Sequence, residues 1–155
     1  MSYTLFNDEI TKAMKEGNKN RLSVLRMIKS DIILEAKKLK TNEESVFVQT
    51  LIKRMKTLEK NKTEVELEAN KKNVDASKFI SLVEYDMSIV KEFLPRIIES
   101  EIENIEISTL LVESLKDFKQ IAQMLKNSPI LKYKGETVLV NTSKIIPIVK
   151  QILGK

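Results

Sequence analysis

The sequence of 155 residues contains no cysteine and no histidine. The absence of cysteine excludes a disulfide scaffold, and the absence of both excludes zinc sites built from Cys and His ligands. Nucleophiles activated by histidine, and histidine general bases, are excluded as well. We therefore expect no metal site and no cofactor, and the residues form no catalytic centre of a common kind.

A Ser-Lys pair is a nucleophile that these absences leave open. Lys29 and Ser30 are sequence neighbours, as are Ser143 and Lys144, but neither pair lies in a Gly-rich segment. The motif support for such a mechanism is therefore weak. No catalytic residue is predicted, and whether the chain is an enzyme stays open at this stage.

Glycine and proline occur only three times each, tryptophan is absent, and aromatic residues make up 5% of the chain. Turns are therefore scarce, and the composition favours an all-α fold of long helices. No apolar run approaches the ~18 residues of a membrane span, and residues 1–4 lack the pattern of a signal peptide. We expect no membrane contact and a cytoplasmic location.

The charges are distributed in blocks, although the net charge is only +5. Residues 18–62 hold 12 Lys or Arg against 5 Asp or Glu, and residues 114–155 hold 8 against 2. Residues 63–113 between them hold 5 against 12. Two interpretations remain: the basic blocks are solvated faces that partly pair with the acidic block, or one of them meets a polyanion.

The first two predicted helices cover residues 4–16 and 19–40. Gly17 is expected to take the left-handed conformation that ends a helix, and Asn18 is expected to cap the next one. The second helix carries an apolar seam at steps of three and four residues, which consists of Leu22, Leu25, Ile28, Ile32, Ala36 and Leu39. This seam predicts one buried face.

Thr41 and Glu44 have the spacing of a capping box, which predicts the start of a third helix over residues 42–72. Only a short connection separates this helix from the one before it. We therefore expect the second and third helices to form a long antiparallel hairpin on which the N-terminal domain is built.

A fourth helix is predicted over residues 76–94 and is stopped by Pro95, because the residue before a proline is pushed out of helical geometry. Its buried stripe is expected to contain Phe79, Leu82, Val83, Met87, Val90 and Leu94. Charge and composition change at this point. The domain boundary is placed just after it, which gives an N-terminal helical domain of residues 1–95 and a small C-terminal helical domain of residues 96–155.

The C-terminal part shows weaker signals. Helices are predicted from Ser100, which has capping-box spacing to Glu103, over residues 116–126, and from Thr142, Ser143 or Pro147 to about Leu153. Pro147 is expected to be tolerated only in the first turn of that last helix. The apolar residues 138–140 fit either a short strand or an irregular core segment.

The basic side chains are the best candidates for a binding site. In the first block they are Arg21, Arg26, Lys29, Lys53, Lys56 and Lys60, the last three of which form one row along a helix that can follow phosphates. In the second block they are Lys116, Lys119, Lys126, Lys132, Lys134, Lys144 and Lys150. Tyr133, between two lysines, either stacks on an unpaired base or anchors its loop, and anchoring is favoured.

Three motifs resemble the YqeY-like (GatB/YqeY domain) family. The segment Arg21-Leu22-Ser23-Val24-Leu25-Arg26-Met27-Ile28-Lys29-Ser30 is similar to the family's N-terminal motif. Ile52-Lys53-Arg54-Met55-Lys56-Thr57-Leu58-Glu59 stands where the family has a lysine-rich segment, and Val90-Lys91-Glu92-Phe93-Leu94-Pro95 resembles its helix end before a proline. Their order and spacing agree over about residues 5–95.

The second half resembles the family less closely. Lys116-Asp117-Phe118-Lys119-Gln120-Ile121 is similar to a family helix whose glycine is Lys119 here, and the Gly-Arg-Ala-Asp-Gly loop that follows in the family is missing. The resemblance implies a helical N-terminal domain and a small C-terminal three-helix domain similar to the tail of the amidotransferase B subunit. In that enzyme, which uses glutamine as amide donor on misacylated tRNA, the tail touches tRNA and catalysis lies elsewhere.

The resemblance therefore implies a non-catalytic accessory module that binds tRNA or another RNA. The alternative is an adaptor that docks a protein partner, such as an amidotransferase or another translation-related protein, through its helical hairpin. A glutamine-dependent enzyme is the third hypothesis, and no residue pattern supports it.

Overall fold

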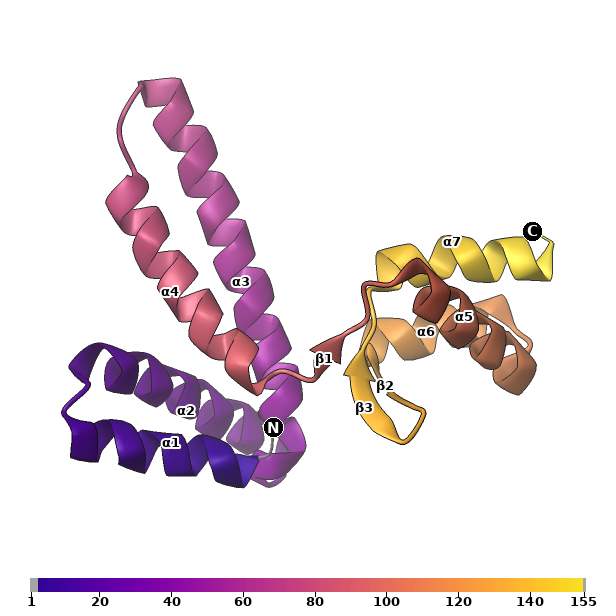
Figure 1. Ribbon diagram of the computed structural model, residues 1–155, viewed down its shortest axis with the longest axis horizontal. Coiled ribbons are helices and arrows are strands. Elements are labelled where there is room, and N and C mark those ends of the chain that lie inside the picture. The colour runs from indigo at the N-terminus through magenta and orange to yellow at the C-terminus, as the bar shows by residue number, and fades with distance from the viewer. Residues whose placement is uncertain (1–2, 155) are drawn as a thin grey trace. The chain divides into compact units, whose positions relative to one another are not determined.

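The computed structural model describes residues 3–154 and divides the chain into two compact units, one up to Leu94 and one from Pro95 onward. Seven helices and three short strands make up the described part (Figure 1). Among residues 3–154, no helix combines the length and the apolar character needed to cross a membrane. Each unit has its own apolar core.

The first unit begins with α1 (Tyr3–Glu16) and α2 (Lys19–Leu39), as the sequence predicts. Gly17 has φ +68°, which is the left-handed conformation expected at a helix end. The side chain of Asn18 accepts a hydrogen bond from the Arg21 amide at 3.2 Å and caps α2. Both features of this turn are confirmed.

The predicted capping box at the start of α3 (Glu43–Lys72) is wrong by one residue, because Asn42 caps the helix. Its side-chain oxygen accepts bonds from the Ser45 amide at 2.8 Å and from the Ser45 hydroxyl at 2.7 Å. Thr41 instead completes the end of α2, where Lys40 has φ +54° and the Thr41 amide donates to the Ala36 carbonyl at 3.0 Å. Because the connection is so short, Thr41 belongs to the C-terminal end of α2 and does not cap α3.

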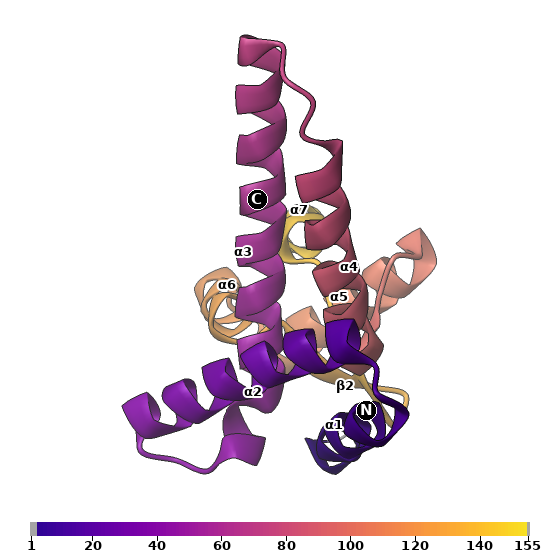
Figure 2. The same ribbon diagram turned by 90° about the vertical axis from the view of Figure 1, so that its left-hand side faces the viewer.

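The predicted antiparallel hairpin of the second and third helices is also wrong. In both views α2 lies across the first turns of α3, whereas α3 and α4 (Ser77–Phe93) run side by side (Figures 1 and 2). The buried side chains of α3 end at Leu58, and the later turns of α3 lie beside α4 (Figures 1 and 2). The hairpin partner of α3 is therefore the helix that follows it, and α1 pairs with α2.

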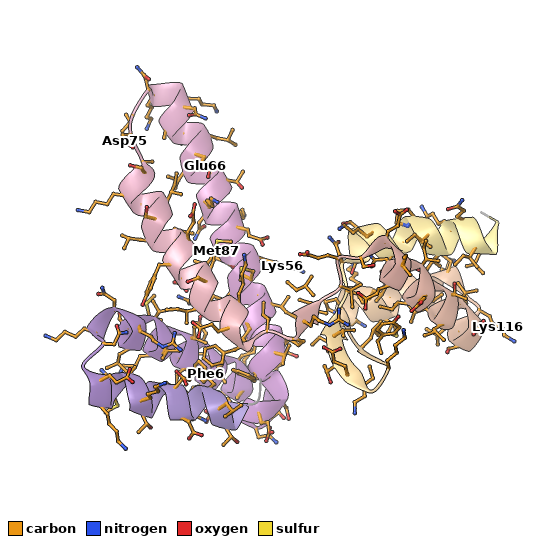
Figure 3. All side chains as sticks on the ribbon, viewed as in Figure 1. Phe6, Lys56, Glu66, Asp75, Met87 and Lys116 are labelled. Carbon is orange, nitrogen blue, oxygen red and sulfur yellow. The ribbon has the colours of Figure 1, made fainter. Side chains whose placement is uncertain are left out.

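Aromatic rings hold the core of the first unit together. Phe6 packs against Phe47 of α3, with ring centroids 5.4 Å apart, and edge-on against Phe93 of α4 at 5.1 Å. The Phe6 side chain lies between α1 and the base of the α3–α4 pair (Figure 3). Edge-to-face and tilted pairs at these distances are favourable beyond the area they bury.

The predicted buried stripe of α4 is only half right. Val83 and Val90 are buried, as expected, but Phe79 is 47% exposed and Leu82 64% exposed. The upper part of α4 extends beyond α1 and α2 and meets only α3 (Figure 2). The apolar residues of α4 therefore keep their helical spacing in the part of the helix that α1 and α2 do not cover.

The chain is mostly helical, so the predicted all-α fold is approximately right, but the second unit also contains a small three-stranded sheet. Its elements are β1 (Arg96–Ile97), α5 (Glu101–Leu115), α6 (Phe118–Asn127), β2 (Ile130–Tyr133), β3 (Glu136–Leu139) and α7 (Thr142–Leu153). The strand order is β1-β3-β2, with β1 parallel and β2 antiparallel to β3. Of the two possibilities for residues 138–140, the strand applies up to Leu139.

A tight turn makes this sheet possible. Lys134 has φ +50° and Gly135 has φ +77°, and a two-residue connection with both φ angles positive matches the right-handed twist of a hairpin. The sequence pair Lys-Gly is a weaker signal for this turn than Asn-Gly. The hairpin and strand β2 were therefore not predicted.

The last helix begins earlier than its proline suggests. Asn141 caps α7 by accepting a hydrogen bond from the Ser143 amide at 3.0 Å, and the helix starts at Thr142. Pro147 consequently lies in the second turn and not in the first, where it removes a backbone hydrogen bond to Ser143. Pro147 is exposed, so water can satisfy the freed carbonyl.

Candidate nucleic-acid interface

In the first basic block, Arg21 is used to join three helices. Its guanidinium donates to both carboxylate oxygens of Glu92 on α4, at 2.7 and 3.0 Å, and to Glu9 on α1 at 2.9 Å. The hydrogen bonds from Arg21 to Glu92 are the main reason why the pKa of Arg21 is raised. Arg21 is therefore a structural residue whose charge is compensated by two carboxylates.

Lys29 is held in a second cluster that ties α2 to α1 and α3. Its ammonium donates to the hydroxyl of Tyr3 and to the side-chain oxygen of Asn7 at 2.9 Å, and lies 3.0 Å from the Glu43 carboxylate. The Tyr3 hydroxyl donates in turn to Glu43. Burial lowers the pKa of Lys29, but the bonds to Tyr3 and Glu43 outweigh it and the pKa is raised.

Arg54 is a structural residue that the sequence did not single out. It donates to Asp86 on α4 at 2.7 and 3.2 Å and to Asp31 on α2 at 2.7 Å, with only 12% of its side chain exposed. A spacing signal could not reveal this, because the three residues are far apart in the sequence. Neighbouring Lys53 binds Glu35 at 2.7 Å.

The remaining candidates on α2 and α3 differ in their contacts. Lys60 lies 4.0 Å from Glu64, an exposed pair of little energetic weight. Within residues 3–154, the side chains of Arg26 and Lys56 form no ion pair or hydrogen bond, and Lys56 projects from the exposed side of α3 (Figure 3). Arg21, Lys29 and Lys53 therefore act as helix connectors, and the predicted Lys53–Lys56–Lys60 row is partly neutralised.

Tyr133 in the second block is an anchor. Its ring is only 4% exposed and belongs to the core of the second unit, and its hydroxyl donates to Glu106 on α5. This bond lowers the pKa of Glu106. Lys134 lies 3.4 Å from the same carboxylate and 5.2 Å from the Tyr133 ring centre. A buried ring cannot stack on a base, so Tyr133 fits the anchoring interpretation.

The exposed face of α6 is different, because its cations are free. Lys119 and Lys126 stand seven residues apart on this helix, and Lys116 precedes it at the exposed turn from α5 (Figure 3). Within the described residues, none of the three forms an ion pair. Amide side chains lie between them, and a shallow hollow is lined by Lys119, Gln120, Gln123, Met124 and Asn127.

A carboxylate also lies beside these cations, and it has another role. Asp117 caps α6 and accepts a hydrogen bond from the Lys119 amide at 3.0 Å. Lys150 of α7 adds a cation nearby, 5.4 Å from the ring centre of Phe118, the first residue of α6. We call Lys116, Lys119, Gln120, Gln123, Lys126 and Asn127 the α6 face.

Two further candidates lie outside the α6 face. Lys132 is exposed on strand β2, and Lys144 is exposed in the first turn of α7. Neither forms an ion pair with any residue that the structure describes. The sequence analysis missed the three amide residues of the α6 face as site residues, although their spacing of three and four along a helix was visible.

Metal binding has no support in the described part of the chain. Because the chain has no His and no Cys, its metal ligands of the usual types are Asp and Glu. Among residues 3–154, no three of these carboxylates lie close enough together to hold a metal ion.

These features define a class: a mostly helical protein of two units, in which Arg21, Lys29 and Arg54 join helices of the first unit and α6 of the second unit carries exposed cations. The family described as Yqey-like protein matches residues 4–153, nearly the whole chain, and the chain belongs to this family. The resemblance drawn from the three motifs is thereby confirmed. No curated protein matches the chain.

Proposed function

We propose that this Yqey-like protein is a non-catalytic RNA-binding module that contacts RNA through the α6 face. The observation that carries the proposal is that Lys116, Lys119 and Lys126 are exposed and unpaired along one side of the described second unit. Such cations neutralise phosphates, and the amides between them can hydrogen-bond to sugars and base edges. An RNA partner also implies action in the cytoplasm.

Transfer RNA is the RNA we favour, and this choice rests on the family resemblance. The segment from Lys116 to Ile121 is where the chain is similar to the tail of the amidotransferase B subunit, which touches tRNA. At the position where the family has a glycine, this chain has Lys119, which adds a cation to the α6 face. We propose an accessory role beside such an enzyme and no catalysis by this chain.

The test is a tRNA-binding titration at several salt concentrations. Each neutralised phosphate adds about −0.7 to −0.9 to the slope of log K against log [salt]. Replacing Lys116, Lys119 and Lys126 by Gln is expected to weaken binding and to reduce the slope by about 2 to 3.

In the matched control, three exposed lysines of the first unit, Lys56, Lys60 and Lys78, are replaced by Gln. It changes the net charge equally and is expected to leave the slope within about 1 of the wild type. Equal losses in both variants would show non-specific charge attraction, and salt-independent or absent binding would end the proposal.

A protein adaptor is the second candidate, and two exposed apolar side chains of α4 favour it. Phe79, Leu82, Asp86, Ile89 and Phe93 follow at steps of three and four, so they lie on one side of α4. Ile89 and Phe93 are buried in the core, whereas Phe79 and Leu82 are exposed. Exposed apolar side chains that continue a packed stripe are typical of a docking surface.

Affinity capture after nuclease treatment tests this candidate. Recovery of one stoichiometric protein by the wild type, and its loss with Phe79→Ser and Leu82→Ser, would favour the adaptor. The variant with Lys116, Lys119 and Lys126 replaced by Gln is the control, because these changes leave α4 unaltered. Loss of the partner with both variants would show that Phe79 and Leu82 are not its specific docking site.

A further inference from the structure

The outward side of α2 is exposed among the residues of the first unit that the structure describes. Met27 is 52% exposed and Leu34 65% exposed, and a shallow hollow beside them is lined by Lys19, Leu22, Ser23, Arg26, Met27 and Ser30. Helical spacing adds Leu34 and Lys37 to the same side. We call Lys19, Ser23, Arg26, Met27, Ser30, Leu34 and Lys37 the α2 outer face.

The charge of this face is of one sign. Lys19, Arg26 and Lys37 are exposed and form no ion pair within residues 3–154. The two acidic residues of α2 point elsewhere, because Asp31 binds Arg54 and Glu35 binds Lys53 on α3. The face therefore offers apolar side chains among uncompensated positive charges, and an occupant must supply apolar groups together with carboxylates.

The outward side of α5 has the complementary character. Ile102 is 70% exposed, Leu110 is 51% exposed, and Ile105 is exposed between them. Glu101 and Glu113 stand near the two ends of this helix, exposed and without an ion pair in the described part of the chain. We call Glu101, Ile102, Ile105, Thr109, Leu110 and Glu113 the α5 outer face.

We propose that the α2 outer face docks the α5 outer face of a second copy of this chain. Each face exposes aliphatic side chains to water, and contact between them removes apolar surface. The unpaired cations of one face then meet the unpaired carboxylates of the other, which fixes the choice of partner. The inference uses residues other than those of the α6 face and does not depend on RNA binding.

The expected association is weak. A contact between two single helices buries less than the ~1,200–2,000 Å² of a standard interface. A dissociation constant in the range of about 10 µM to 1 mM is therefore expected, and it rises with salt because exposed charges are screened. Sedimentation of the nucleic-acid-free full chain at increasing concentration measures it.

Charge reversal gives the decisive test. The first variant carries Lys19→Glu and Arg26→Glu, so both of its faces are acidic. The second carries Glu101→Lys and Glu113→Lys, so both of its faces are basic. Each alone is expected to lose self-association by at least about tenfold, because like charges then face each other. An equimolar mixture is expected to associate again, since every contact pairs an acidic with a basic face.

The control variant carries Lys56→Glu and Lys78→Glu, which makes the same charge change as the first variant on exposed positions outside both faces. It is expected to associate like the wild type. Circular dichroism establishes that all variants are folded. A wild type that is monomeric throughout, association that needs added RNA, or folded variants whose mixture stays monomeric would each overturn the proposal.

Discussion

Arg54 shows how one side chain can join three helices of the first unit. Its two carboxylate partners come from α2 and α4, and both Arg54 and Asp86 are largely shielded from water. A shielded ion pair adds little compared with apolar packing, but the loss of one member leaves the other charge uncompensated. Arg54 therefore matters for stability mainly because its removal would leave the charges of Asp31 and Asp86 uncompensated.

Replacing Arg54 by Met is expected to lower the free energy of unfolding by about 2–4 kcal/mol, because Asp31 and Asp86 lose their partner at an incompletely solvated site. Chemical denaturation followed by circular dichroism measures the change. Lys56→Met is the control, since Lys56 is exposed and unpaired in the described chain, and its effect is expected to stay within ~0.5 kcal/mol. Equal effects in the two variants would contradict the role given to Arg54.

The turn residue Gly135 supports a prediction at the same scale. A Cβ added at Gly135 would meet no atom within 4 Å, so the cost of a side chain comes only from φ +77°. Gly135→Ala is expected to destabilise the second unit by about 1–2 kcal/mol. Lys134→Asn, which gives the preferred Asn-Gly pair, is expected to be neutral or to stabilise slightly. Thermal unfolding tests both, and tolerance of alanine would contradict the turn assignment.

At the scale of elements, the neighbouring residues Thr41 and Asn42 have different roles: Thr41 ends α2, and Asn42 caps α3. Asn42→Ala is expected to cost about 1 kcal/mol because the Ser45 amide loses its acceptor, whereas Thr41→Ala is expected to cost far less. Thr41 contributes only its backbone amide to the end of α2. The comparison is made by denaturant unfolding, and the reverse order would restore the capping box that the sequence predicted.

The sequence predicted those elements whose signals are local. Gly17 and Asn18 mark one turn, Ser100 marks the start of α5, and Pro95 marks the end of α4, because each acts within a few residues. The errors concern partners distant in sequence. The helix that packs along α3 depends on how far α1 and α2 extend in space. Strand β2 forms because β3 pairs with it.

The candidate site divides in the same way. Lysines and arginines are visible in a sequence, but their carboxylate partners are not. Arg21 meets Glu92 across 71 positions, and Arg54 meets Asp86 across 32. The first basic block therefore looked as available as the second, and only the structure separates paired cations from the free ones on the α6 face.

At the scale of the whole molecule, two cores predict two folding units. We propose that residues 1–94 fold without the rest, with a helical circular dichroism spectrum and cooperative melting. A fragment of residues 1–82 is the control, because it lacks Ile89 and Phe93 from the core. We expect it to unfold. A disordered 1–94 fragment, or a folded 1–82 fragment, would contradict the proposal.

The pairing of β1 with β3 has a consequence for synthesis. Arg96 stands beside Val138 in the sheet, and the same arginine binds Glu136 at 3.0 Å. A chain emerging from the ribosome therefore presents β1 long before its neighbouring strand exists, whereas every residue of the first core has already appeared. Because domains generally fold as units in order of synthesis, the nascent chain is expected to complete the first unit while the opening strand of the second still waits for its partner.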